Sequence, residues 1–191
     1  IRNCDWSSDV CSSDLWFQVF ESPTGPDGKP HEVRNVVGYV PGSDPALEGQ
    51  AGIISAHYDH LGLGWPDVRA EAVGQIHHGA DDNASGVAVL IELARALAQG
   101  PPPRRSLVLV AFTAEESGLL GSRHYVANPL PFAQPGIVGV VNLDTVGRLG
   151  DGPVQVLGTE SAREWPFVFQ GIGFVTGVPV KVVAGASQSS D

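Results

Sequence analysis

Four segments of the sequence carry side chains that could bind metal ions. Each segment lies just after an apolar run or just before a helical pattern, and the side chains are His57, Asp59, Asp81, Asp82, Glu115, Glu116 and Asp144. Carboxylates gathered in one place repel one another and are costly to bury unless cations are bound there. An imidazole among carboxylates suits Zn²⁺, with Mn²⁺ or Co²⁺ as substitutes, and the number of carboxylates suggests two ions that share one of them.

Each motif alone also has an ordinary explanation. His57-Tyr58-Asp59 is a short pattern that arises by chance. Glu115-Glu116 could be a solvated helix start, where the helix dipole favours acidic residues, and residues 82–86 could be only a capping turn. Their shared position at the ends of predicted strands is what favours a site, because ligands bind outside the carboxyl ends of the strands in open α/β sheets.

The elements that must position these residues follow from the apolar patterning. Residues 16–21 and 32–40 predict an antiparallel hairpin, and a helix is expected from about Asn83 to Gly100 because apolar residues recur along one face. A second helical stretch spans 117–126. Short apolar runs typical of buried strands lie at 52–56, 107–112 and 137–143, with further possible strands at 154–157 and 180–183.

Strands that alternate with helices predict an α/β fold, a three-layer sandwich with a central, mostly parallel mixed sheet flanked by helices. The length of 191 residues suits one substantial core, so we expect a single domain over 16–191. The formal net charge of -10 argues against nucleic-acid binding. No apolar run approaches the roughly 20 residues that cross a bilayer, so no transmembrane segment is expected.

Residues 1–15 differ from the rest of the chain. They are rich in Ser and Asp, contain both cysteines, and show neither a helical nor a strand period. They resemble a translated sequencing adapter, so we predict that this segment is not native and exclude it from the fold.

Four motifs together resemble one known family. Residues 56–62 (AHYDHLG), 79–86 (GADDNASG), 112–118 (FTAEESG) and 142–144 (NLD) occur in the order typical of peptidase family M28, the family of the two-zinc bacterial leucyl aminopeptidases. The resemblance runs from about Asn35 to the end of the chain. It implies a zinc-exopeptidase fold and an aminopeptidase that hydrolyses N-terminal peptide bonds of peptides or small aminoacyl substrates.

The resemblance also implies a role for individual residues. His57 and Asp144 would bind one zinc ion, Glu116 would bind the second, and Asp81 would bridge both, with a cis peptide bond between Asp81 and Asp82. Asp59 would orient the imidazole of His57. Glu115 would be the general base that takes a proton from a water activated by the two ions and returns it to the leaving amine.

One departure from the family pattern concerns the second zinc. The family has a ligand histidine after a Ser-Asp pair, and this sequence ends with Ser190-Asp191, so we expect that histidine to come next in the parent protein and the 191-residue chain to be impaired without it. His60, His77, His78 and His124 are not obvious substitutes. Relatives are often secreted or periplasmic, and we expect the same here.

Two alternatives remain open from the sequence. One is a glutaminyl-cyclase-like acyltransferase with a single zinc, and the other is a non-catalytic relative of receptor ectodomains. The presence of His57, Glu115 and Asp144 argues against the second, because an interaction platform needs none of them. Side-chain specificity and oligomeric state cannot be read from the residues.

Overall fold

The computed structural model describes residues 15–130, 136–183 and 190–191. Apart from Leu15, the segment predicted to be non-native lies outside the described residues. The chain divides into two compact units, one of residues 1–145 with Asp191 and the other of residues 146–190. Each unit is described by itself.

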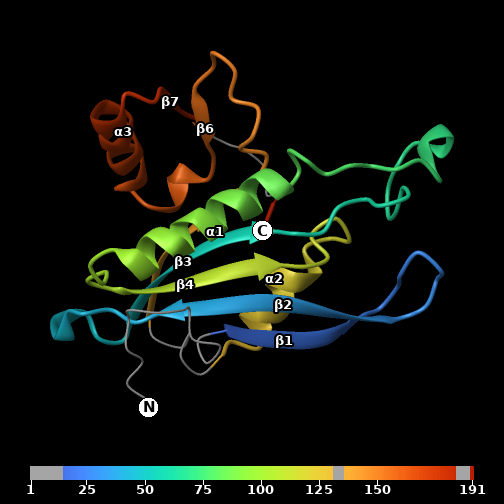
Figure 1. Ribbon diagram of the computed structural model, residues 1–191, viewed down its shortest axis with the longest axis horizontal. Coiled ribbons are helices and arrows are strands. Elements are labelled where there is room, and N and C mark those ends of the chain that lie inside the picture. The colour runs from blue at the N-terminus through green and yellow to red at the C-terminus, as the bar shows by residue number, and fades with distance from the viewer. Residues whose placement is uncertain (1–14, 131–135, 184–189) are drawn as a thin grey trace. The chain divides into compact units, whose positions relative to one another are not determined.

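The first unit is built on a five-stranded mixed sheet with the strand order β1-β2-β4-β3-β5 (Figure 1). The pairs β1/β2 and β2/β4 are antiparallel, whereas β3 pairs in parallel with both β4 and β5. The strands are β1 (Leu15–Ser22), β2 (His31–Val40), β3 (Gln50–His57), β4 (Ser106–Phe112) and β5 (Gly136–Asn142). The predicted hairpin and the three predicted strands are confirmed. The expectation that all three are buried is wrong for β5, which lies at an edge of the sheet and has mostly exposed residues.

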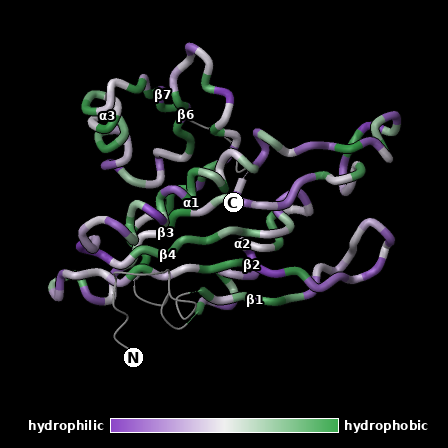
Figure 2. The backbone as a smooth tube through the Cα atoms, viewed as in Figure 1, coloured by the Kyte–Doolittle hydropathy of each residue, from purple (hydrophilic) through white to green (hydrophobic). Residues whose placement is uncertain are grey.

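Two helices cover opposite faces of this sheet. Helix α1 (Ala84–Gln99) packs Leu90 against Ala56 and Leu109, and helix α2 (Leu120–Ala127) packs Tyr125 into a cluster with Val110. Successive residues of β4 therefore point into two different cores, which is why the strand is apolar throughout (Figure 2). The arrangement of helix, sheet and helix is the predicted α/β sandwich.

The helix boundaries follow from local chemistry. Asn83 begins α1 because its side chain accepts a hydrogen bond from the Gly86 N–H, and the helix ends at Gly100. This agrees with the predicted helix, whereas α2 starts later than the expected 117 because Gly118 and Leu119 adopt positive φ angles. Within the described residues, no helix is long and apolar enough to cross a membrane.

The second unit contains the two remaining predicted strands. These strands, β6 (Val154–Val156) and β7 (Val180–Val182), pair in parallel as a separate two-stranded sheet, and helix α3 (Trp165–Thr176) connects them. A right-handed crossover through a helix is the usual way to join two parallel strands. Short 3-10 helices lie at η1 (Pro45–Leu47), η2 (Ala70–Ala72) and η4 (Thr159–Ser161).

Candidate metal centre

The carboxyl ends of β3 and β4 meet at one edge of the central sheet, next to the start of α1 (Figure 1). His57 is the last residue of β3, and Glu115 and Glu116 follow β4. Asp144 follows β5, which lies on the other side of β3. The register of three parallel strands therefore brings together residues that are far apart in the sequence.

The imidazole of His57 lies at the centre of this edge and is 1% exposed. Its Nε2 lies 3.1 Å from Asp82 Oδ1 and 3.6 Å from Asp144 Oδ1. Its Nδ1 lies 3.2 Å from the backbone carbonyl oxygen of Asp59, which can only accept a hydrogen bond. A proton on Nδ1 is thus held by Asp59, and Nε2 is left facing the two carboxylates.

Asp59 connects two of the strand ends. Its carboxylate accepts hydrogen bonds from the backbone N–H groups of Glu115 at 3.1 Å and Glu116 at 3.3 Å. The same carboxylate lies 3.7 Å from His57 Nδ1. One side chain thus fixes the turn that carries both glutamates relative to the imidazole at the end of β3.

The first cluster of potential ligands is His57, Asp82 and Asp144. A tetrahedral zinc ion about 2.0–2.2 Å from each ligand atom separates its ligands by about 3.3–3.6 Å. The two distances from His57 Nε2, 3.1 and 3.6 Å, are close to that spacing. Asp82 Oδ1 is buried and, although His57 Nε2 lies 3.1 Å away, it accepts no hydrogen bond of acceptable geometry in the described part of the chain. A buried anionic oxygen without a donor is costly, and a bound cation removes that cost. The residues fit a zinc ion.

A second cluster shares Asp82 and adds His60 and Glu116. His60 Nδ1 lies 2.7 Å from Glu116 Oε1 and 4.0 Å from Asp82 Oδ1. The short distance is that of a hydrogen bond, so this cluster is less regular than the first. The sequence favoured His60 as a residue that orients a ligand or lies on the surface, whereas the structure places it among the potential ligands of this cluster.

The carboxylate common to both clusters is that of Asp82, whereas the family resemblance was taken to imply Asp81 as the bridging ligand. Both clusters contain Asp82, and neither cluster found among the described residues contains Asp81. The cis peptide bond predicted between Asp81 and Asp82 is also wrong by one position, because it lies between Asp82 and Asn83. Asn83 caps α1, and the carboxylate of the residue directly before it lies 3.1 Å from His57 Nε2 at the end of β3.

Burial and neighbouring charges shift the pKa values at this edge. Burial raises the pKa of Glu115 to about 7, with Asp191, Glu116 and Asp144 adding to the rise and His57 opposing it. Burial alone would lower the pKa of His57, but hydrogen bonding to Asp144 and Asp59 outweighs it and raises the pKa to about 11. Burial also raises the pKa values of Glu116 and Asp191. The site thus retains protons in the absence of a cation.

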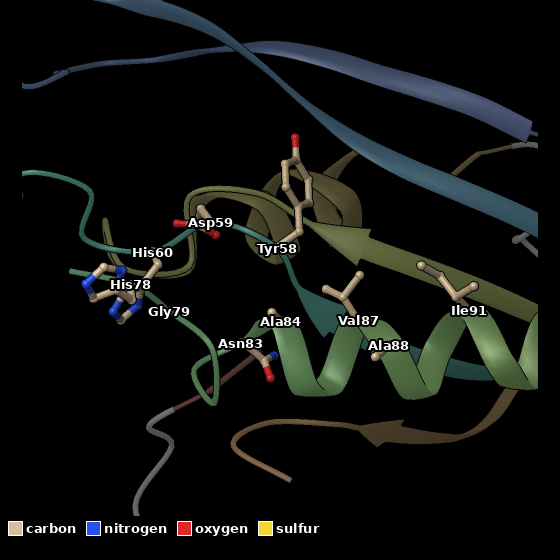
Figure 3. A pocket seen from close by; sticks show the side chains of 10 residues that line it. All are labelled: Tyr58, Asp59, His60, His78, Gly79, Asn83, Ala84, Val87, Ala88 and Ile91. Carbon is tan, nitrogen blue, oxygen red and sulfur yellow. The ribbon is translucent and has the colours of Figure 1, made fainter. Parts of the chain in front are cut away.

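A pocket of about 380 Å³ lies beside the clusters, and Figure 3 shows its lining. Val87 and Ile91 of α1 form its apolar end, and His60 and His78 lie toward the other end. The hydroxyl of Tyr58 donates a hydrogen bond to the Arg34 carbonyl, which anchors this side chain to β2. The pocket shares His60 with the second cluster, so it adjoins the candidate metal centre.

The residues of both clusters lie in a part of the chain that matches a known protein family. A sequence model described as peptidase family M28 matches residues 35–175, which include all the residues of both clusters. The chain belongs to peptidase family M28. A "probable zinc metalloprotease" of Leptosphaeria maculans is 36% identical over 118 residues, which are 62% of this chain and 25% of that protein. A "probable zinc metalloprotease" of Pyrenophora tritici-repentis is 34% identical over 119 residues. The chain spans about a quarter of the length of these curated relatives.

Solved structures that superpose on this M28 chain share its fold. Porphyromonas gingivalis glutaminyl cyclase superposes with a TM-score of 0.71 at 23% identity, over 92% of this chain and 63% of that one. A zinc aminopeptidase from Bacillus subtilis superposes with a TM-score of 0.64 at 25% identity, over 84% of this chain and 36% of that one. The same fold therefore carries at least two named activities among these neighbours.

Proposed function

We propose that the chain is the catalytic part of a zinc aminopeptidase that hydrolyses N-terminal peptide bonds. The observation that carries the proposal is the cluster of His57, Asp82 and Asp144 beside Glu115 at one edge of the sheet. Membership of peptidase family M28 and the similarity to named zinc metalloproteases and a zinc aminopeptidase support it.

Each proposed ion would lie at one of the two clusters, with four of their side chains as ligands. His57 and Asp144 would hold one ion, Glu116 the other, and Asp82, in place of Asp81, would contact both. Zinc at such a site polarises a carbonyl group and lowers the pKa of water.

Glu115 is the proposed general base. Its pKa of about 7 is suited to exchanging protons near neutral pH, since a general base works best when its pKa lies near the operating pH. Glu115 accepts a proton from the attacking water and passes it to the nitrogen of the leaving amine. Asp59 holds the backbone of Glu115 while this happens.

Replacing Glu115 by Gln tests the base assignment. The amide keeps the shape but cannot accept the proton, so we expect aminoacyl anilide hydrolysis to fall by about 10²- to 10⁴-fold while the zinc content stays unchanged. Glu92→Gln on the exposed face of α1 is the matched control and should keep full activity. Hydrolysis by Glu115→Gln at a rate near that of the parent would remove Glu115 as the base.

A glutaminyl-cyclase-like acyltransferase is the second candidate function. The fold is shared with Porphyromonas gingivalis glutaminyl cyclase, and the first cluster alone would hold the single zinc of that reaction. Zinc stoichiometry, measured together with assays on an aminoacyl anilide and a peptide with N-terminal glutamine, separates the two. One bound zinc, cyclisation of the glutamine peptide and no hydrolysis of the anilide would favour the acyltransferase. Neither cyclisation nor hydrolysis would favour a non-catalytic relative.

A further inference from the structure

Asn83 is a buried residue whose side chain is almost fully hydrogen-bonded. It is 2% exposed and lies directly after Asp82. Its Oδ1 accepts hydrogen bonds from the N–H groups of Gly86 at 3.1 Å and Thr145 at 3.2 Å. Its Nδ2 donates to the carbonyl oxygen of Leu143 at 2.9 Å. Only the bond to Gly86 is needed to cap α1.

The other two hydrogen bonds of Asn83 reach a different element. Leu143 and Thr145 are the residues on either side of Asp144, in the segment that follows β5. The amide of Asn83 therefore holds the backbone both before and after Asp144. Since Asn83 is bonded through the main chain to Asp82, one side chain ties together the two carboxylates of the first cluster.

The hydrogen bonds of Asn83 oppose electrostatic repulsion at this site. The carboxylates of Asp82 and Asp144 belong to separate segments and repel each other when both are charged. Ligand atoms of the first cluster nevertheless lie within 4.8 Å of one another. Three hydrogen bonds of a buried amide resist the movement that would relieve this repulsion, because breaking any of them leaves a buried polar group without its partner.

We propose that Asn83 is a positioning residue that sets the separation of the Asp82 and Asp144 carboxylates and so tunes metal affinity. The inference rests on the proposed metal site. Asn83 does not itself need to touch the ion or the substrate, because it acts through the backbone of the two ligands. Partners that orient metal ligands typically change metal affinity by 10- to 100-fold when they are replaced.

Zinc titration of Asn83→Ala, with Asn35→Ala as a matched control, tests the proposal. Asn35 is also fully buried and makes three hydrogen bonds, to Gln18, Gly121 and Thr113, but none to the segments that hold Asp82 and Asp144. Both variants should lower the melting temperature of the metal-free protein. Only Asn83→Ala should weaken zinc binding, by about 10- to 100-fold, and shift the visible absorption spectrum of bound Co²⁺.

Asn83→Asp provides a second test, which can be used even if Asn83→Ala folds poorly. The carboxylate keeps the shape and both accepted hydrogen bonds but faces the Leu143 carbonyl without a donor. A positioning role predicts weaker zinc binding than in the parent. A simple charge effect predicts the opposite, because an added negative charge attracts the cation.

The outcomes also separate this inference from the proposed function. Failure of the parent protein to bind zinc would remove the metal site itself. The positioning role of Asn83 would be overturned, with the metal site intact, if the unmutated protein binds zinc and Asn83→Ala binds it with an affinity within about threefold. Tighter zinc binding by Asn83→Asp than by the unmutated protein would overturn it as well.

Discussion

Asp82 belongs to both clusters of potential ligands found among the described residues, and its neighbour Asp81 belongs to neither. Both carboxylates precede the helix cap, and nothing in their spacing distinguishes them. In the structure Asp82 Oδ1 lies 3.1 Å from His57 Nε2, whereas the backbone carbonyl of Asp81 accepts a hydrogen bond from the Ser85 hydroxyl. The choice between them depends on backbone direction at the start of α1, which a sequence pattern does not encode.

A pair of variants tests the assignment to Asp82. Asp82→Asn removes a ligand charge from both clusters, so we expect zinc affinity to fall by more than about 100-fold, beyond the effect of losing an orienting partner. Asp81→Asn makes the same chemical change one residue earlier and should alter affinity by less than about tenfold. Calorimetric zinc titration measures both, and the reverse ranking would restore the sequence-based assignment.

Other site residues were easier to place from the sequence. His57, Glu115, Glu116 and Asp144 were expected together because each follows a run with the apolar pattern of a buried strand. The structure brings them to one edge, and their catalytic and ligand roles remain predictions. His60 lies in the loop after β3, where neither helical nor strand periodicity fixes the direction of a side chain, so the sequence does not predict its short distance to Glu116.

At the scale of elements, the contact between the start of α1 and the segment after β5 depends on Gly86. A Cβ atom at this position would lie 2.4 Å from the Leu143 carbonyl oxygen and 2.5 Å from Asn83 Oδ1. The Leu143 carbonyl oxygen accepts a hydrogen bond from Asn83 Nδ2, and Asn83 Oδ1 accepts one from the Thr145 N–H, so both atoms take part in the hydrogen bonds that connect the two segments. The sequence predicted α1 from its apolar face, but the need for glycine at this position became visible only when the partner segment was known.

Gly86→Ala should therefore destabilise the protein. Overpacking against atoms that cannot move freely typically costs about 1–3 kcal/mol, which urea unfolding can measure. Gly171→Ala in α3 is the matched control, because a Cβ atom there meets no atom within 4 Å and alanine favours a helix over glycine by about 1 kcal/mol. Equal effects of the two substitutions would argue against close packing at Gly86.

The sequence predicts which residues form strands better than it predicts which strands pair. The hairpin of β1 and β2 and the apolar runs of β3, β4 and β5 have enough residues to show their pattern. Strands β6 and β7 have three residues each, and they pair with each other rather than with the central sheet. Runs this short were expected as strands, but they hold no information about which edge they join.

For the molecule as a whole, proton binding links metal binding to stability. Glu115 has a pKa raised from 4.5 to about 7, and His57 has one raised from 6.5 to about 11. A raised pKa means that the folded state binds the proton more tightly than the unfolded state. The stabilisation is complete below pH 4.5 for Glu115 and below pH 6.5 for His57. It is lost as the pH rises through about 7 and about 11.

The metal-free protein should accordingly melt at a lower temperature at pH 9 than at pH 5. Zinc should reverse this trend, because binding displaces the proton of His57 and so strengthens as the pH rises. Melting curves at several pH values, with zinc or with a chelator, measure both effects. A melting temperature of the chelated protein that rises from pH 5 to pH 9 would contradict the proposed protonation of the site.

The parallel pairing of β3 with β5 also decides when a metal site can exist during folding. Ser55 and Asn142, which are hydrogen-bonded across these strands, are separated by 87 positions in the sequence, and His57 and Asp144 each follow one of them by two residues. Closing so long a loop costs chain entropy before any ligand geometry is gained. We therefore expect the ligand geometry of the first cluster to form only once β3 and β5 have paired.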